Sequence, residues 1–309
     1  MPDRIVFLGT VEFSRHMLDE TLKRKGNVCA VWSVAREQAG EIPDWRDLSD
    51  LTRDRSIEHH EVKHLGTPEN LARIRELRPD TILAMGFPET LSVELLSTAR
   101  LGTVGSHPSA LPRNRGETPI PGQILHGETE GGLTFFLMGE GVQDGPIVSQ
   151  RRFKITLTDT ASTLYAKTII AGREMLGDVT AMLERGQFDT TPQDESLATY
   201  LPSGDLDNRH IDWKQNARRT YDLVRAATEP YPGAFCYLGS RKLILWEVGF
   251  SHEPVEARPG EVVRISDRGV EVATGAGLLV IRTVQVVREK EHALDVFVRA
   301  GASLGTILS

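Results

Sequence analysis

The feature that most restricts the fold is an alternation of short apolar runs with amphipathic stretches along the first 185 residues. A short apolar run bounded by turn residues is typical of a buried strand, and apolar residues three and four apart are typical of a helix. Helices that alternate with buried strands predict an open, mostly parallel α/β sheet, because parallel strands need a crossover connection. The expected strands are 5–8, 28–34, 81–85, 102–105, 133–138 and 145–153, and the expected helices are 14–24, 69–78, 93–99 and 161–185.

A different pattern begins after Gly186. Residues 187–208 are polar and rich in Thr, Pro and Asp, which is typical of a linker. One helical stretch, 216–227, is followed by short strands separated by turns, and such a series indicates a small β-barrel. We therefore predict an α/β domain over 1–186, a linker over 187–208 and a C-terminal β-barrel domain over 209–309.

The composition is that of a globular protein with an acidic balance. Lys and Arg number 36 against 43 Asp and Glu, and the resulting net charge of -7 argues against a broad nucleic-acid surface. The sequence contains neither a secretory leader pattern nor a long apolar run, so we expect a cytoplasmic protein without a membrane partner. Cys29 and Cys236 lie in apolar, strand-like settings and are expected to be free thiols.

Several familiar signals are absent or weak. The turn 9–13 lacks the glycine spacing of a dinucleotide site or a P-loop. His59, His60 and His64 are not framed by a carboxylate pair, so a solvated loop is expected there rather than a metal site. The Gly-Xaa-Ser-Xaa-Gly pattern of serine hydrolases does not occur.

Two polar segments follow expected strands and carry the chemistry. The first runs from Gly105 to Gly116 and places His107 at the end of a strand, within a loop punctuated by prolines. The second, 138–147, forms a tight polar turn between two strands. Because ligands of open α/β sheets bind beyond the carboxyl ends of the strands, we expect His107 to meet substrate there.

These two segments resemble the folate-dependent formyltransferase family, which includes methionyl-tRNA formyltransferase, sugar-nucleotide N-formyltransferases and glycinamide ribonucleotide formyltransferase. The signature of that family is Asn-x-His-(Pro/Gly)-Ser-Leu-Leu-Pro-x-x-Arg-Gly, followed further on by Asp-x-Gly-(Pro/Asp)-Ile. The positions that agree with it are His107, Ser109, Leu111, Pro112, Arg115 and Gly116, and then Gly145, Pro146 and Ile147.

The resemblance extends over nearly the whole chain. The turn 9–13 is similar to the opening turn of the family, and Ile211–Trp213 with 224–235 is similar to the start of its C-terminal domain. Within that segment, 229–235 is nearer to the 4-amino-arabinose-type sugar-nucleotide enzyme than to the tRNA enzyme. The resemblance implies a Rossmann-like formyltransferase domain followed by an OB-like β-barrel.

The resemblance also implies a reaction, and two of its catalytic positions are altered. The family moves a formyl group from N10-formyltetrahydrofolate to an amine, and an Asn, a His and an Asp serve the oxyanion and the departing proton. His107 matches the histidine, but Gly105 stands where the Asn is expected and Gln143 where the Asp is expected. The loss of one hydrogen-bond donor to the oxyanion typically costs about 2.7–4 kcal/mol of transition-state stabilisation. Asp144 lies one residue later, where a bulge could re-aim it.

Three interpretations stay open from the sequence. The enzyme transfers formyl groups with Asp144, Ser106 or backbone donors as substitutes for the missing side chains. Alternatively, the fold is kept and the chemistry has changed to another acyl, carbamoyl or one-carbon reaction. In the third interpretation, the chain is a catalytically inactive relative that acts as a binding module.

The resemblance assigns further residues to ligand binding. The pterin would lie between two loops that contact it largely through backbone groups. The candidate cofactor-binding residues are Met85, Gly86, Phe87, Pro88 and Leu91 in one loop, and Gly139, Glu140, Gly141 and Asp144 in the other. The candidate substrate-loop residues are Ser109, Pro112, Arg115 and Gly116.

The acceptor is expected to be a small-molecule amine rather than tRNA. Residues 209–309 hold 14 Lys and Arg against 12 Asp and Glu, whereas a tRNA-binding domain would be distinctly basic. A nucleotide-linked amino sugar is the first candidate, and an amino acid or natural-product precursor is the second. The long segment 36–55 would lie at the edge of the site, either as an acceptor-selecting loop or as a surface excursion. The sequence leaves open whether the chain forms a homo-oligomer.

Overall fold

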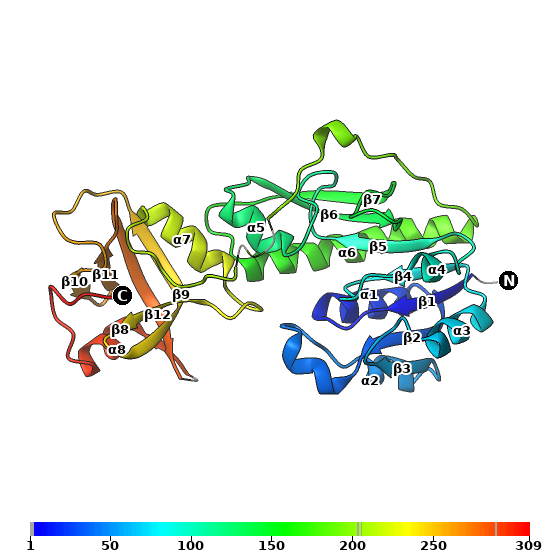
Figure 1. Cartoon of the computed structure of the whole chain (residues 1–309), viewed down its shortest axis with the longest axis horizontal. Coiled ribbons are helices and arrows are strands. Elements are labelled where there is room, and N and C mark those ends of the chain that lie inside the picture. Colours follow the sequence, from blue (N-terminus) through cyan, green and yellow to red (C-terminus); the bar gives the residue numbers. More distant parts are fainter. Residues whose placement is uncertain (1–2, 203, 205, 288) are drawn as a thin grey trace. The chain divides into compact units, whose positions relative to one another are not determined.

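The computed structural model of the chain describes residues 3–309 except 203, 205 and 288. The chain divides into two compact units (Figure 1). The first unit comprises Met1–Pro119, Glu130–Lys154 and Tyr165–Leu201, and the second comprises Ile120–Thr129, Ile155–Leu164 and Pro202–Ser309.

The first unit is built on a seven-stranded sheet with the order β3-β2-β1-β4-β5-β6-β7. The strands β1 to β5 are parallel, and β6 and β7 are added antiparallel, which confirms the mostly parallel sheet. Since the chain leaves β1 toward β2 on one side and returns to β4 on the other, the crevice for ligands is expected at the carboxyl ends of β1 and β4. The bounds are β1 (Arg4–Leu8), β2 (Asn27–Val34), β3 (Glu58–Val62), β4 (Thr81–Ala84), β5 (Thr103–His107), β6 (Glu130–Leu137) and β7 (Ile147–Lys154).

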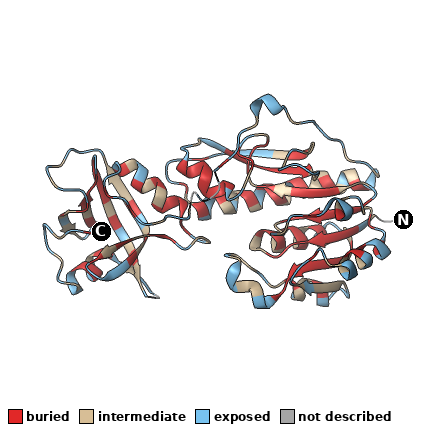
Figure 2. Cartoon of the chain, in the orientation of Figure 1, coloured by how far each residue is buried: buried red, intermediate tan, exposed pale blue. Residues whose placement is uncertain are grey.

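Helices cover both faces of this sheet, because successive strand residues point to opposite sides. In β1, Phe7 belongs to a core shared with α1 and α6, whereas Leu8 belongs to a core shared with α3 and α4. Figure 2 shows this burial as a continuous band along the strands. The helices are α1 (Glu12–Lys23), α2 (Ser49–Arg53), α3 (Pro68–Leu77), α4 (Val93–Leu96) and α6 (Ala161–Glu184), with the short 3-10 turns η1 (Arg36–Glu41) and η2 (Glu195–Leu197).

The strand β3 corrects one expectation from the sequence. His59 and His60 lie within it, paired with β2, so the prediction of a solvated loop was wrong for these two residues. The ring of His60 stacks on Trp32 with the ring centroids 4.5 Å apart, and burial lowers the pKa of His59. The strand escaped notice because the run Glu-His-His-Glu-Val lacks the apolar alternation on which the prediction depends.

The second unit contains an antiparallel sheet with the order β10-β11-β12-β9-β8, and β13 pairs with β12. Residues near the C-terminus bridge its two edges, since Leu308 pairs with Leu238 of β8 and Ile307 pairs with Glu261 next to β10. The predicted antiparallel β domain is confirmed, while β13 and α8 were not predicted. The bounds are α5 (Pro119–Leu125), α7 (Ala217–Ala226), β8 (Ala234–Leu238), β9 (Arg241–Ser251), β10 (Val262–Ser266), β11 (Gly269–Ala273), β12 (Leu278–Val286), β13 (Glu289–His292) and α8 (Ala293–Arg299).

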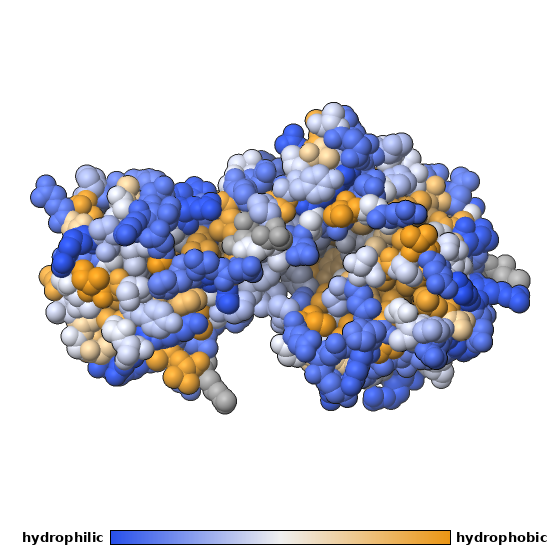
Figure 3. Space-filling model, in the orientation of Figure 1, coloured by the Kyte–Doolittle hydropathy of each residue, from blue (hydrophilic) through white to orange (hydrophobic). Residues whose placement is uncertain are grey.

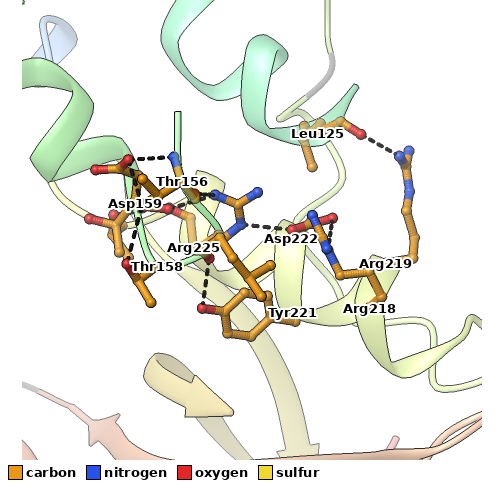
Figure 4. A network of polar contacts seen from close by, with 12 residues as sticks. Leu125, Thr156, Thr158, Asp159, Arg218, Arg219, Tyr221, Asp222 and Arg225 are labelled. Carbon is orange, nitrogen blue, oxygen red and sulfur yellow. Dashed lines mark hydrogen bonds and ion pairs between the residues drawn. The ribbon is translucent and has the colours of Figure 1, made fainter. Parts of the chain in front are cut away.

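A buried polar network joins α7 to the segment Ile155–Leu164 within the second unit (Figure 4). The guanidinium of Arg225 donates to Asp222 at 2.7 Å and to the backbone carbonyl of Asp159 at 2.7 Å. Asp222 also accepts from Arg218 at 2.8 Å, and the carboxylate of Asp159 accepts from the backbone nitrogen of Thr156 at 2.7 Å. Every charge in this network therefore has a partner, as burial requires.

The surface carries no large apolar area on the face that Figure 3 shows. Hydrophobic residues reach that face in small patches separated by hydrophilic ones. Across the described residues, no helix is long and apolar enough to span a bilayer. In the same part of the chain, no group of three or more His, Cys, Asp or Glu side chains could hold a metal ion.

Candidate active site

His107 is the last residue of β5 and is buried, with 4% of its surface exposed. Its Nε2 lies 2.8 Å from the backbone oxygen of Asn114. A carbonyl oxygen only accepts hydrogen bonds, so Nε2 carries the hydrogen in this pair. In the neutral ring, Nδ1 is then left with a free lone pair that can accept a proton.

The protonation state of His107 follows from its surroundings. Burial lowers the pKa of His107 to about 4, and the positive charge of Arg115 acts in the same direction. The hydrogen bond to Asn114 opposes this lowering without reversing it. At neutral pH the imidazole is therefore uncharged and available as a base.

The loop after His107 is held by hydrogen bonds to its own backbone and to β6. Ser109 donates its hydroxyl to the backbone oxygen of Arg113 at 2.7 Å, and Thr134 of β6 donates to the backbone oxygen of Ser109 at 2.8 Å. The peptide bond before Pro112 is cis. Gly116 ends the loop at a φ of 109°, a conformation that strongly favours glycine. The substrate-loop candidates thus form one structured segment next to His107.

Gly105 is required by the packing of a neighbouring side chain. A Cβ added at Gly105 would lie 2.7 Å from Cγ and 2.9 Å from Sδ of Met138, and 3.2 Å from the ring of Phe136. The space next to His107 on the same face of β5 is therefore filled by a thioether in place of an amide donor. Ser106 lies between these two residues, so its side chain faces the other side of the sheet.

Gln143 connects the second polar turn to the loop of His107. Its side-chain oxygen accepts a hydrogen bond from the backbone nitrogen of Gly116 at 2.9 Å. The residue has a φ of 48°, which places its backbone in the left-handed region. Because Oε1 is committed to Gly116, the amide nitrogen is the part of the side chain that remains to donate elsewhere.

Asp144 is exposed and lies over the turn that precedes it. A Cβ added at Gly141 would come within 1.9 Å of its carboxylate, and one at Gly139 would come within 3.8 Å. Glu140 in the same turn is also exposed. The described hydrogen bonds of the His107 ring include no carboxylate, so Asp144 is not hydrogen-bonded to this histidine.

The loop after β4 packs against the turn after β1. Ser14 of α1 donates its hydroxyl to the backbone oxygen of Met85, and Gly86 has a φ of 75° with Val11 close to the place of a side chain. Leu91 is buried, and Phe87 is half-buried against the core beneath α3 and α4. Pro88 is exposed. The loop thus presents both backbone and an aromatic ring at the edge where β1 and β4 end.

Arg115 reveals site residues that the sequence reasoning did not identify. Its side chain is 1% exposed and pairs with Glu195 at 2.6 Å and with Gln193 at 2.9 Å. It also donates to the hydroxyl of Tyr200 at 3.0 Å. These partners belong to the polar stretch 187–208, which the sequence predicts to be a linker, and no local pattern distinguishes them from other surface residues.

The comparisons with known proteins agree with this architecture. Residues 3–180 match the formyl transferase family, and residues 205–300 match the C-terminal domain of formyl transferases. The chain belongs to the formyl transferase family. This match confirms the resemblance that the motif around His107 indicated. The chain is therefore a formyltransferase enzyme of the class that uses N10-formyltetrahydrofolate.

Individual relatives cover nearly the full length of the chain. A methionyl-tRNA formyltransferase of Geotalea uraniireducens is 31% identical over an alignment of 310 positions, which covers 99% of this chain and 97% of that protein. The structure of WlaRD, a sugar 3N-formyl transferase, has a TM-score of 0.67 at 16% identity and covers 94% of this chain and 99% of its own.

A third relative is a longer protein. The structure of HypX from Aquifex aeolicus, solved in complex with tetrahydrofolic acid, has a TM-score of 0.67 at 22% identity. It covers 96% of this chain, whereas this chain spans 47% of HypX. At these identities the two solved structures support the fold of this formyl transferase rather than the identity of its acceptor.

Proposed function

We propose that this formyl transferase moves a formyl group from N10-formyltetrahydrofolate to the amine of a small molecule, with His107 as the base. The observation that carries the proposal is the pairing of His107 Nε2 with the backbone oxygen of Asn114. It fixes the tautomer in which Nδ1 is bare, and burial keeps the ring uncharged. A neutral, oriented imidazole at the end of β5 is what proton removal from an attacking amine requires.

His107 moves one proton in this reaction. As the amine nitrogen bonds to the formyl carbon, Nδ1 of His107 takes the proton that the nitrogen releases. As the bond between the formyl carbon and N10 breaks, the imidazole returns that proton to N10. The formylated amine and tetrahydrofolate leave, and His107 is neutral again.

The oxyanion needs a donor that Gly105 does not supply. We assign this role to the amide nitrogen of Gln143, since its oxygen is bound to Gly116. A single preorganised donor typically contributes about 2.7–4 kcal/mol to the transition state. Asp144 and Ser106 are not needed for this assignment.

The two loops proposed for the pterin have the chemistry that the group requires. Gly139 and Gly141 carry no side chains to cover the backbone of an exposed turn. In the loop after β4, half-buried Phe87 supplies apolar surface, and Leu91 is buried in the core beneath it. A pterin presents a flat ring with amide-like donors and acceptors, which backbone groups can match. Met85, Gly86, Pro88, Glu140 and Asp144 complete the proposed binding loops.

A small amine is our first candidate for the acceptor, and a nucleotide-linked amino sugar is the leading example. The near balance of charge in residues 209–309 supports it, since a tRNA-binding surface would be basic. WlaRD is described as a sugar 3N-formyl transferase, and a second solved relative from Helicobacter canadensis is described in complex with folinic acid and dTDP-3-aminofucose.

Transfer to a tRNA-borne amine is the second candidate, and one surface of the second unit favours it. The rings of His210, Phe235 and Tyr237 lie within 5.2–5.8 Å of one another, and Lys242 lies 3.8 Å from the centre of the Phe235 ring. Aromatic rings beside cations can stack on unpaired bases. The methionyl-tRNA formyltransferase relatives support the same candidate.

The test supplies N10-formyltetrahydrofolate with a panel of amino sugars, amino-sugar nucleotides, amino acids and methionyl-tRNA, and detects formylated products by mass spectrometry. A formylated small amine, absent with His107→Ala, supports the proposal. A formylated methionyl-tRNA alone would replace the first candidate by the second.

The donor is tested separately by calorimetric titration with 5-formyltetrahydrofolate. Micromolar binding, about -8 kcal/mol, without any formylated product would point to a changed one-carbon reaction. Absence of binding at millimolar ligand would overturn the folate-dependent function altogether.

A further inference from the structure

Residues 191–201, called the strap below, run along the loop that follows His107. Arg115 donates its backbone nitrogen to the oxygen of Thr199, and Leu201 donates back to the oxygen of Arg115, both at 2.9 Å. At the other end, Thr191 and Ile147 exchange two backbone hydrogen bonds of 2.8 Å. Most strap residues are exposed, so polar contacts rather than apolar burial hold the strap in place.

Among the hydrogen bonds of the described residues, those of the Gln193 side chain join the strap to both polar segments of the site. Its amide nitrogen donates to the backbone oxygens of Gln143 and Gly145, each at 2.7 Å. Its amide oxygen accepts from the guanidinium of Arg115 at 2.9 Å. Both hydrogens and the oxygen of this amide are thus used between two loops that lie far apart in the sequence.

These hydrogen bonds join the loop that follows His107 to the turn that carries Gln143. The side chain of Gln143 accepts a hydrogen bond from the backbone nitrogen of Gly116. The backbone oxygen of Gln143 accepts one from the side chain of Gln193. On the other side, Arg115 follows directly after Asn114, whose oxygen accepts from His107. A shift of Gln193 would therefore change the separation between the base and the turn that carries Gln143.

We propose that Gln193 is a positioning residue that sets the orientation of His107 relative to Gln143 during formyl transfer. The proposal rests on the proposed function, because it takes His107 as the base. Only an amide suits the position: a carboxylate cannot donate to two carbonyl oxygens, and an ammonium cannot accept from Arg115. Misplacement of reacting groups by about 1 Å can cost about 100-fold in rate.

The test compares Gln193→Glu with Gln187→Glu. Both changes replace an amide by a carboxylate of the same shape, and Gln187 is an exposed residue just before the strap whose side chain has no hydrogen bond among the described residues. We expect Gln193→Glu to lower kcat by about tenfold or more with little change in the KM for the folate donor. Gln187→Glu should stay within about twofold of the wild type.

A second readout does not depend on activity. Nitrogen-15 NMR of the imidazole of His107 reports its tautomer and its titration, and both should change in Gln193→Glu and in Gln193→Ala but not in Gln187→Glu. A purely structural role would lower the thermal unfolding temperature and leave the imidazole signals of the folded protein unchanged.

The proposal is overturned if the signals of His107 stay those of the wild type in both Gln193 variants, with or without a fall in kcat, and also if both variants keep the wild-type kcat. A wild-type protein that formylates no acceptor defeats the proposed function instead, and the imidazole signals still decide whether Gln193 positions His107.

Discussion

At the residue scale, the partner of His107 determines what this histidine can do. Its ring donates to a backbone oxygen of Asn114, whereas a carboxylate was expected at the position of Gln143. A carboxylate would stabilise the charged imidazolium, and a neutral carbonyl does so less. Burial therefore holds the ring in the neutral form that can accept a proton, and the hydrogen bond to Asn114 opposes this without reversing it.

The first prediction concerns the pH dependence of catalysis. The base must be neutral to work, and the pKa of His107 is lowered to about 4 by burial. We therefore expect kcat to stay flat as the pH falls through 6 and to decline only toward pH 4, measured at saturating donor and acceptor. A decline centred near about 6.5, the ordinary value for histidine, would contradict this assignment.

The same shift predicts how stability depends on pH. The pKa of His107 is lower in the folded than in the unfolded chain, so between about 6.5 and 4 the unfolded chain binds the extra proton. The contribution of His107 to stability is therefore present above about pH 6.5 and is lost as the pH falls toward 4. Chemical unfolding at several pH values should show this loss in the wild type and a smaller loss in His107→Gln.

Another prediction at this scale concerns the pair Gly105 and Met138. Gly105→Asn places a side chain where Met138 already lies, and such overpacking typically costs about 1–3 kcal/mol. The double variant Gly105→Asn with Met138→Ala should recover most of that loss, measured by thermal unfolding. Equal stability of the single and the double variant would show that Met138 does not set the limit at position 105.

At the element scale, segments without a clear periodicity hold the regular elements together. The strap closes over the loop of His107, and residues 306–309 bridge the edges of the sheet in the second unit. Each works through backbone hydrogen bonds, which impose no apolar pattern on the sequence. Regular strands and helices therefore depend on irregular neighbours for their placement.

The polar network on α7 gives a testable consequence for stability. Arg225→Ala removes the donor to Asp222 and to the carbonyl of Asp159 while leaving Asp222 buried. Breaking a buried pair costs about 3–5 kcal/mol, and the remaining bond from Arg218 should keep the loss near the lower end. Urea unfolding of the two proteins measures it, with Arg241→Ala, an exposed residue at the start of β9, as the control.

Removal of residues 306–309 should loosen the edges of the second sheet. Four backbone hydrogen bonds to residues 237, 260 and 262 are lost: Tyr237 and Ser309 exchange bonds of 2.6 Å and 3.1 Å, Leu308 donates to Gly260 at 2.8 Å, and Val262 donates to Thr306 at 2.8 Å. We expect faster amide exchange at Tyr237 and Val262 and unchanged exchange in β1 of the first unit. Unaltered protection of these two amides would show that the tail does not close the sheet.

At the scale of the whole molecule, charge bears on the kind of acceptor. The net charge of -7 is unfavourable for a long polyanion and nearly irrelevant for a small amine. We therefore expect tRNA not to be retained in gel-shift assays at about 0.15 M salt. Retention that weakens steeply as salt rises, and that is lost in Lys242→Glu, would favour the tRNA candidate.

The two compact units do not follow one cut in the sequence. Ile120–Thr129 and Ile155–Leu164 belong to the second unit although residues on both sides of each belong to the first. The predicted boundaries at 186 and 209 stay a prediction, because the sequence shows changes of pattern and not which segments pack together. Contacts between distant segments leave no local signal in the sequence, so the assignment of these two segments to the second unit could not be predicted.

The sequence by itself indicated a mostly parallel sheet, without β3 and without the order of its strands, and placed His107 at the end of a strand. These features rest on periodicities of two and 3.6 residues and on a strand that ends in a histidine loop, and both are local properties of the chain. The motif around His107 also determined the family, because its residues lie within one short segment.

Only the tertiary structure decided how the site is assembled. Met138 fills the space over Gly105, Gln143 binds Gly116, and Gln193 joins two loops that are about fifty residues and more away in the chain. These contacts depend on side chains that meet across elements, and a polar residue shows no pattern that tells which distant backbone group it will bind. Long-range polar contacts are therefore decided by the tertiary structure, whereas most helices and strands can be predicted from short-range apolar patterns.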